Sequence, residues 1–143
     1  MVRLLKTGKK IISIDETSVT ETNNLHHTWQ KVGSEERHCY KQAFANITVI
    51  GAITMAGRVY YSLVRGSNTA VTYAIFLEEL ADRLDQDEPG WRGTSVLIQD
   101  NAALHRGPAV LKAIRDNKLP IWNSAPASFC CLAIELWWAK FKE

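Results

Sequence analysis

Three acidic residues occur where an α/β protein often places reactive groups. Asp15 follows the apolar run Ile11–Ile14, and Asp100 follows the run Val96–Gln99. Functional sites in α/β sheets gather at the carboxyl ends of strands, so these two carboxylates converge if their strands are neighbours. Glu135 lies on an expected helix that follows a proline-containing loop, and from there it could reach the same point.

Carboxylates gathered around one point repel one another, which raises the pKa of some of them. Hard divalent cations prefer oxygen ligands and relieve that repulsion. Two cations held about 4 Å apart activate a nucleophile and stabilise the leaving oxygen in phosphoryl transfer. The three acids therefore indicate metal-assisted phosphate chemistry. The plain alternative is that strands end in aspartate because loops are polar, and residue type alone leaves both interpretations open.

The elements that must position these acids follow from the apolar periodicity. The expected strands are residues 10–15, 47–54, 58–64, 94–99 and 119–122, with the second and third forming a hairpin. The expected helices begin at residues 66–69, at 107–108 and near 130. The segments 16–45 and 86–93 are predicted to be irregular. This order predicts an α/β fold with a mixed sheet and helices packed on it.

Helical spacing also predicts which side chains face the core. The residues concerned are Tyr73, Phe76, Leu77, Leu80 and Leu84 in the first helix, Val110, Leu111 and Ile114 in the second, and Leu132, Leu136 and Phe141 in the last. Trp137 and Trp138 are adjacent, so we expect one to pack and the other to be partly exposed.

Composition limits the class of protein. The chain has 143 residues, of which 46% are hydrophobic and 22% charged, and we expect a single domain over residues 1–143. Its formal net charge of +2 is too small to indicate nucleic acid by itself. No apolar run approaches the roughly 18 residues of a membrane span, so no membrane partner is expected. An odd number of cysteines, two of them adjacent, favours a reducing compartment.

Five sequence blocks, taken in order, resemble the catalytic domain of the Tc1/mariner and IS630 transposase superfamily. The blocks are Ile12–Thr17, Trp29–Gly33, Val49–Ile53, the Asp-Asn-x-x-x-His block at residues 100–105, and Ile134-Glu135 followed by Trp138. Thirty-four residues separate Asp100 from Glu135, which is similar to the spacing of that family's Asp-Asp-Glu triad. Each block is weak alone, but the ordered set is specific.

The resemblance implies an RNase H-like fold and a DNA transposase catalytic domain. It implies that Asp15, Asp100 and Glu135 bind two Mg²⁺ or Mn²⁺ ions for phosphodiester hydrolysis and strand transfer. The implied partners are DNA, as transposon ends and target, and a second copy of the chain in a homodimer. The implied location is the nucleus in a eukaryote, or the cytoplasm and nucleoid in a bacterium.

The sequence also departs from the family pattern. Leu132 stands where the family has an asparagine that would help hold the loop before Glu135. The block Phe129–Ala133 differs throughout, and no helix-turn-helix DNA-binding region precedes the first strand. These departures suggest a fragment, a separate reading frame or a decayed or domesticated copy. The alternative function is therefore a catalytically impaired remnant that binds DNA or protein. Another RNase H-like nuclease, acting on RNA–DNA hybrids, is a third hypothesis.

Several further residues are candidates for DNA binding or for support of the triad. His105 could contact DNA, or it could be a loop histidine bonded to backbone. Asn101 is expected to orient Asp100 or to cap a turn. Trp29 and Gly33 resemble part of the family's clamp loop, which supports dimer contacts, with a packed hairpin as the alternative for Trp29. Lys31 could contact a DNA phosphate, with a solvated surface position as the alternative. Glu16 should point away from Asp15 because strand residues alternate, so we expect it at the surface or behind the site.

Overall fold

The computed structural model describes residues 8–20, 46–124 and 133–141. Its sheet contains the strands β1 (Lys10–Thr20), β2 (Asn46–Thr54), β3 (Val59–Arg65), β4 (Ser95–Gln99) and β5 (Ile121–Asn123). The strand order is β3-β2-β1-β4-β5. The pairs β1–β2 and β2–β3 are antiparallel, whereas β1–β4 and β4–β5 are parallel. This confirms the mixed sheet and the hairpin.

Strand β1 is longer than predicted. The sequence suggested an end at Asp15, but the strand continues to Thr20, and pairing with β2 runs from Ile12 to Thr20. The polar residues after Asp15 remain extended because the apolar strand β2 supplies hydrogen-bonding partners along their whole length. Asp15 therefore lies within a strand, and the expectation that it ends one was wrong.

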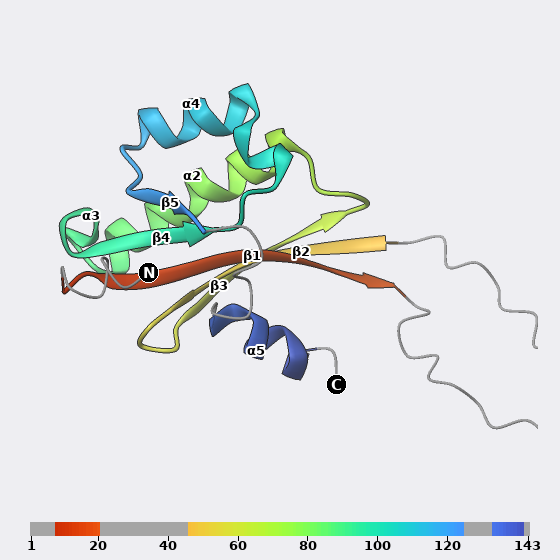
Figure 1. Cartoon of the computed structure of the whole chain (residues 1–143), viewed down its shortest axis with the longest axis horizontal. Helices are drawn as coiled ribbons and strands as arrows, with labels where there is room; N and C mark the ends of the chain where they lie inside the picture. The colour runs from red at the N-terminus through yellow and green to blue at the C-terminus, as the bar shows by residue number, and fades with distance from the viewer. Residues whose placement is uncertain (1–7, 21–45, 125–132, 142–143) are drawn as a thin grey trace, which may run out of the picture.

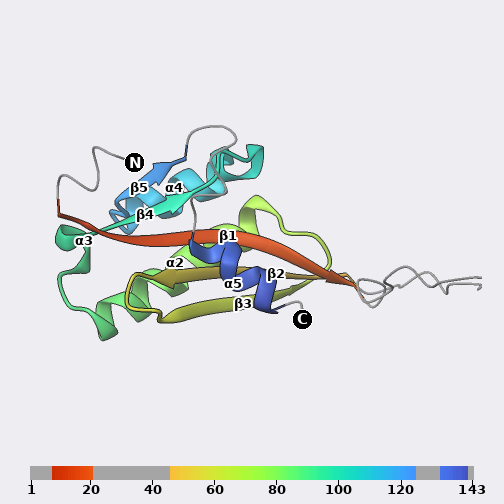
Figure 2. The same cartoon turned by 60° about the horizontal axis from the view of Figure 1, so that its bottom comes forward.

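Helices cover the two faces of the sheet separately (Figures 1 and 2). The helices α2 (Ala70–Asp87) and α4 (Pro108–Asp116) lie on one face, and α5 (Ala133–Phe141) lies on the other. Two short helices, α3 (Trp91–Thr94) and η1 (Ala103–Arg106), flank β4. Within the described residues, no helix is long and apolar enough to cross a bilayer.

Each face has its own hydrophobic core. The larger core joins β1, β2 and β4 to the buried stripe of α2, and it contains all five residues predicted for that helix. The smaller core consists of Val49, Val96, Ile98, Ile134 and Trp138. Trp91 is also fully buried, although the sequence placed it in a loop.

Three residues predicted for the core are exposed instead. Leu111 is 52% exposed because α4 turns Val110 and Ala113 inward. Leu136 and Phe141 are 77% and 45% exposed because α5 packs through Ile134 and Trp138, one helical turn apart. Leu132 lies outside the described residues.

Helix α2 begins with a capping box. The Thr69 hydroxyl accepts a hydrogen bond from the Thr72 amide, and the Thr72 hydroxyl accepts one from the Thr69 amide. These bonds satisfy amides that have no partner within the helix, as the sequence predicted from the polar run at residues 66–69.

Replacing Thr69 with valine keeps the side-chain shape and removes the capping oxygen. We expect the free energy of unfolding to fall by about 1 kcal/mol, measured by urea denaturation. Thr94→Val is the matched control, since its hydroxyl makes only a 3.5 Å contact with the Trp91 carbonyl. An equal loss in both variants would contradict the capping role.

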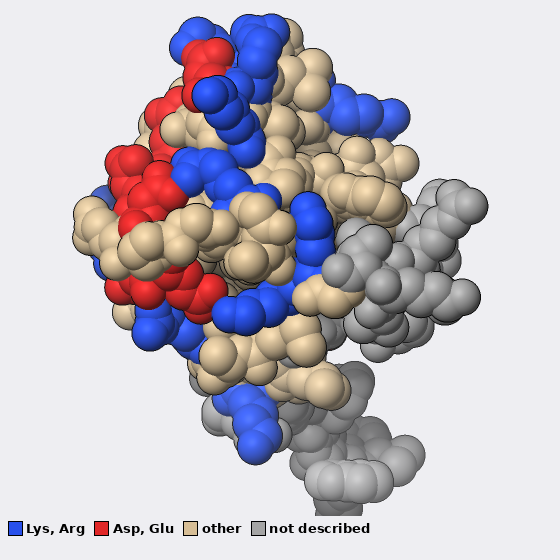
Figure 3. Space-filling view, turned by 90° about the vertical axis from the view of Figure 1, so that its left-hand side faces the viewer, with Lys and Arg blue, Asp and Glu red and all other residues tan. Residues whose placement is uncertain are grey.

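Acidic side chains gather along one side of one end of the molecule, with basic side chains around them (Figure 3). Three ion pairs join α2 and the loop after it to neighbouring elements: Lys10 with Glu88, Arg58 with Asp87, and Arg92 with Asp85. These pairs lie at the end of the sheet where β4 begins, so their charges offset one another there and leave no uniform basic surface among them.

Candidate active site

The sheet register places Asp15 and Asp100 just beyond the paired segment of two adjacent strands. β1 and β4 are adjacent and parallel, with Ser13 opposite Ile98, so two more residues along each strand lead to Asp15 and Asp100. Ser13 and Ile98 share their face with Asp15 because side chains alternate along a strand. The two strands are therefore neighbours, which is the condition that the sequence left open.

Asp15 is held by a tryptophan from α5. The Trp138 indole nitrogen donates a hydrogen bond to Asp15 Oδ2 at 2.9 Å, and Trp138 is only 4% exposed. Gly51, the partner of Asp15 on β2, makes room for the ring. A Cβ at Gly51 would lie 2.8 Å from Cη2 of Trp138, closer than any normal contact.

The environment of Asp15 raises the pKa of its carboxyl from 3.8 to about 6. Burial is the largest cause, and the charges of Glu135 and Glu16 add to it. Hydrogen bonds from the Glu16 amide and the Trp138 indole act in the opposite direction but do not cancel the effect. A buried carboxylate with acidic neighbours is a site that a cation would stabilise.

Glu135 comes from the first turn of α5 and is partly exposed. Its neighbour Ile134 is fully buried, and Trp138 anchors the same helix one turn later. This anchoring holds α5 beside Asp15, near enough for the charge of Glu135 to act on that carboxyl. The structure thus brings Glu135, the last acid of the motif, within electrostatic reach of Asp15, the first.

Asp100 follows β4 and makes local hydrogen bonds. Its Oδ1 accepts the Ala102 amide at 3.0 Å and lies 2.9 Å from Nδ1 of His105. The same ring nitrogen is 3.2 Å from the Asp100 carbonyl oxygen. The Asp100 side chain remains 44% exposed, so one of its oxygens is engaged while the group stays accessible to solvent.

His105 and Glu16 meet on the opposite face of the sheet from Asp15. The distance between His105 Nε2 and Glu16 Oε1 is 3.0 Å, and their side chains are 2% and 16% exposed. Burial lowers the pKa of His105, but the hydrogen bond and charge of Glu16, with Asp100, outweigh it and raise that pKa above 6.5. Strand alternation predicted the direction of Glu16 correctly, but no sequence signal identified its partner.

The remaining candidates are less informative. The Asn101 side chain is exposed, and no hydrogen bond between it and Asp100 occurs among the described residues. Trp29 and Lys31 lie outside the described residues, so their proposed contacts stay predictions. Asn68, which sequence reasoning missed, donates to Glu16 Oε1 at 2.8 Å.

The donor chemistry of the three acids fits a hard divalent cation. Asp15 lies in β1, Asp100 follows the adjacent parallel strand β4, and Glu135 supplies a third carboxylate from α5. The raised pKa of Asp15 marks the unfavourable charge that such an ion would relieve. As placed, however, no three histidine, cysteine, aspartate or glutamate side chains of the described residues are gathered closely enough to hold an ion.

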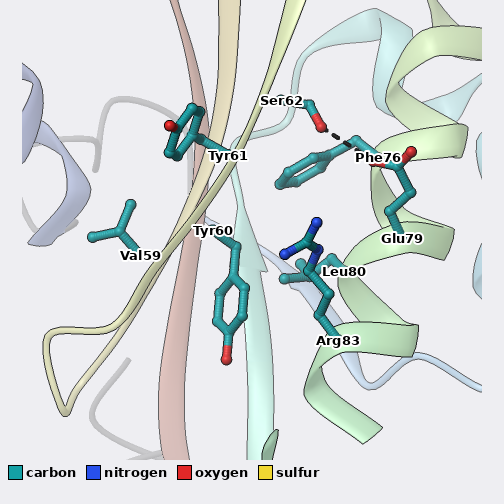
Figure 4. Close-up of a pocket in the computed structure, with 8 residues that line it drawn as sticks. All are labelled: Val59, Tyr60, Tyr61, Ser62, Phe76, Glu79, Leu80 and Arg83. Carbon is teal, nitrogen blue, oxygen red and sulfur yellow. Dashed lines mark hydrogen bonds between the residues drawn. The ribbon is translucent and has the colours of Figure 1, made fainter. Parts of the chain in front are cut away.

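A separate groove of about 300 Å³ lies between β3 and α2 (Figure 4). It is lined by four consecutive residues of β3 and by Phe76, Glu79, Leu80 and Arg83 of α2. None of the three acids lines it, and Arg83 reaches across it from α2 towards β3. The groove is therefore distinct from the candidate site.

Comparison with solved structures gives the same fold. The pre-cleavage Mos1 transpososome matches with a TM-score of 0.73 and 16% identity, covering 98% of this chain and 44% of that chain. The catalytic domain of Mos1 mariner transposase matches with a TM-score of 0.68 and 16% identity, covering 98% and 63% respectively. The Mos1 paired-end complex with Mn matches with a TM-score of 0.70 and 17% identity, covering 98% and 44%.

The chain spans less than two thirds of the length of these Mos1 structures. No curated protein matches it in sequence. Its residues 10–143 match the family described as DDE superfamily endonuclease, which covers the sheet, both flanking helical layers and all three acids. The chain therefore belongs to the DDE superfamily endonucleases, and its mixed sheet has the RNase H-like fold of the Mos1 catalytic domain.

Proposed function

We propose that this chain is a DNA transposase catalytic domain that hydrolyses phosphodiester bonds at transposon ends and transfers the freed strand to target DNA. The observation that carries the proposal is the adjacency of the parallel strands β1 and β4, which puts Asp15 and Asp100 just beyond the same end of their paired segment, with Glu135 acting on Asp15 from α5. Membership of the endonuclease family supports the reaction type.

In this proposal Asp15, Asp100 and Glu135 hold the divalent ions. Bound Mg²⁺ or Mn²⁺ supplies the acidity that activates an attacking water or 3′-hydroxyl and the charge that stabilises the leaving oxygen. The carboxylates themselves need not accept the proton, and no covalent bond between protein and DNA is required. Trp138 fixes the orientation of Asp15, and the buried end of α5 fixes the approach of Glu135.

DNA and a second copy of the chain are the proposed partners. Among the similar structures are a Mos1 paired-end complex with left transposon end and a Mos1 strand transfer complex. By analogy, we propose that this chain acts on paired DNA ends as a homodimer. Its location would then be the compartment that holds the DNA, either a nucleus or a bacterial nucleoid.

The test is Mn²⁺-dependent nicking of supercoiled DNA by the 143-residue chain. We expect nicking that EDTA stops and that Glu135→Gln lowers by about 100-fold, because a carboxylate aimed at the ions is lost. Glu88→Gln is the matched control, since Glu88 pairs with Lys10 at the far end of β4. If the wild type neither nicks DNA nor binds Mn²⁺, the enzyme proposal fails and the non-catalytic remnant is supported.

A further inference from the structure

We propose that His105 is a positioning residue that orients the Asp100 carboxylate, and that Glu16 holds His105 in place from the opposite face of the sheet. The proposal rests on the proposed function, because it assigns these residues to the metal site without having them touch the metal. Glu16 would then support the site through the sheet, although its side chain points away from Asp15.

The hydrogen-bonding groups around the His105 ring define its role. Nε2 faces Glu16 Oε1 at 3.0 Å, while Nδ1 faces Asp100 Oδ1 at 2.9 Å and the Asp100 carbonyl at 3.2 Å. An ionised carboxylate and a carbonyl oxygen only accept hydrogen bonds, so each ring nitrogen is placed to donate. The ring thus links β1 to the residue that follows β4 by a charged hydrogen bond to Glu16, a hydrogen bond to the Asp100 carbonyl and an ion-pair contact with Asp100 Oδ1.

The ring is also fixed from its side. It stacks on Tyr73 of α2 with centroids 4.3 Å apart and planes 28° apart. The Tyr73 hydroxyl donates to Gln99 Oε1 at 2.7 Å, and Gln99 donates to Asn123 Oδ1 at 2.9 Å. Tyr73 and Gln99 are almost fully buried, so His105 rests against a rigid surface. This burial leaves the His105 side chain 2% exposed and unable to reach a DNA phosphate without local opening.

Glu16 is held as firmly as the ring it supports. The Asn68 amide donates to Glu16 Oε1 at 2.8 Å, and the Thr72 hydroxyl donates to Asn68 Oδ1 at 2.6 Å. The start of α2 is therefore connected to Glu16 and, through His105, to Asp100. The Asp100 carboxylate, held in this way, loses little conformational entropy when it binds an ion, because its rotamer is already selected.

As a result, the two carboxylate oxygens of Asp100 have different roles, one bound within the protein and one left for a ligand. Oδ1 receives His105 and the Ala102 amide, and within the described part of the chain no hydrogen bond to Oδ2 is found. With the side chain 44% exposed, Oδ2 is the oxygen left for a cation. Losing the His105 bond would let the carboxylate rotate and would weaken metal binding without removing any ligand.

Two substitutions of His105 separate this role from simple packing. Asparagine places its amide nitrogen near the position of Nδ1, so His105→Asn keeps a donor for Asp100 and loses Glu16. Glutamine places its amide nitrogen near Nε2, so His105→Gln keeps Glu16 and loses Asp100. Both lose the ring stacked on Tyr73, so both should lower the melting temperature to a similar extent.

We expect His105→Gln to weaken Mn²⁺ binding by about 10–100-fold, measured by calorimetry, and His105→Asn to weaken it by about threefold at most. A metal-free readout accompanies this test, namely hydrogen exchange of the Ala102 amide by NMR. Exchange should speed up in His105→Gln and stay slow in His105→Asn, because that amide donates to the same Asp100 oxygen. Equal effects of the two variants on both readouts would overturn the proposal, as would a larger effect of asparagine.

A double-mutant cycle tests whether Glu16 acts on the metal site through His105. Glu16→Gln alone should weaken Mn²⁺ binding by roughly fivefold, because a charged hydrogen-bond partner becomes neutral. It should add nothing in the His105→Gln background if Glu16 acts through the ring. Additive losses of Mn²⁺ affinity would show that Glu16 acts on the metal directly and would overturn the proposal that Glu16 acts through His105.

Tyr60→Phe is the matched control, since it keeps a buried ring away from His105 and removes only the hydroxyl that donates to Asp87 Oδ2. It should lower stability and leave Mn²⁺ affinity and Ala102 exchange unchanged. If the wild type binds no Mn²⁺, the proposed function fails, while the comparison of Ala102 exchange still decides whether His105 orients Asp100.

Discussion

Replacing Asp15 with asparagine is expected to make the protein more stable above pH 6. The same substitution should abolish its stabilisation by divalent metal. The reason for the first effect is the pKa of Asp15, which is raised to about 6 by burial and then by the charge of Glu135. Asparagine has no charge to bury, and its side-chain oxygen can still accept the Trp138 indole hydrogen bond.

The sign of the pH dependence follows from proton linkage. The folded chain holds the Asp15 proton up to about pH 6, whereas the unfolded chain releases it near 3.8. The free energy of unfolding of the wild type therefore falls as pH rises from about 4 to 6 and stays lower above that. The difference between the variant and the wild type should be near zero below pH 4 and largest above pH 6.

The magnitude is limited by solvent around the carboxyl. A full shift of this size corresponds to about 3 kcal/mol, and partial exposure reduces it to about 1–2 kcal/mol. Thermal unfolding should show this as a gain of about 3–6 °C at pH 8. In Mn²⁺ at about 100 times its dissociation constant, the wild type should gain about 2.7 kcal/mol and the variant almost nothing. Nicking activity should fall by about 1,000-fold.

Asp85→Asn is the control for the direction of this effect. A hydrogen bond from Arg92 lowers the pKa of Asp85, so removing its charge should destabilise the protein at pH 8. Its response to Mn²⁺ should be unchanged. A loss of stability in Asp15→Asn at pH 8 would contradict the account of Asp15 as an unfavourably placed charge.

Replacing Gly51 with alanine is expected to damage stability and the site together. The added Cβ would lie 2.8 Å from Cη2 and 3.1 Å from Cζ2 of Trp138, so the indole must move. Moving it strains the small core and withdraws the hydrogen bond from Asp15. Overpacking with loss of a charged hydrogen bond costs about 2–4 kcal/mol, or about 5–15 °C in melting temperature.

Urea denaturation and Mn²⁺ calorimetry measure the two consequences of Gly51→Ala. Gly93→Ala is the matched control, because a Cβ there meets nothing within 4 Å and alanine suits the short helix α3. In a Trp138→Leu background, which removes the clashing ring, Gly51→Ala should cost less than about 1 kcal/mol. The same loss in both backgrounds would show that the contact with Trp138 is not the cause.

The candidate site was only partly predictable. The apolar runs before Asp15 and Asp100 and the spacing to Glu135 are local features, and they made the three acids candidates. The contact of Trp138 with Asp15 joins residues 123 positions apart, and the contact of His105 with Glu16 joins residues 89 apart. No periodicity or motif spacing encodes such pairs, because they depend on how β1, η1 and α5 are placed in space.

The sequence by itself determined the alternation of strands and helices, the buried stripe of α2 and the face of β1 on which Glu16 lies, since these depend on backbone periodicity and local capping. The tertiary structure decided where β1 ends, because pairing with β2 keeps its polar half extended. It also decided that Leu111 and Leu136 are exposed, because each short helix buries only the stripe that meets a neighbour. Above all, it decided the charge state of Asp15, because burial and the approach of Glu135 arise only when α5 packs on the sheet.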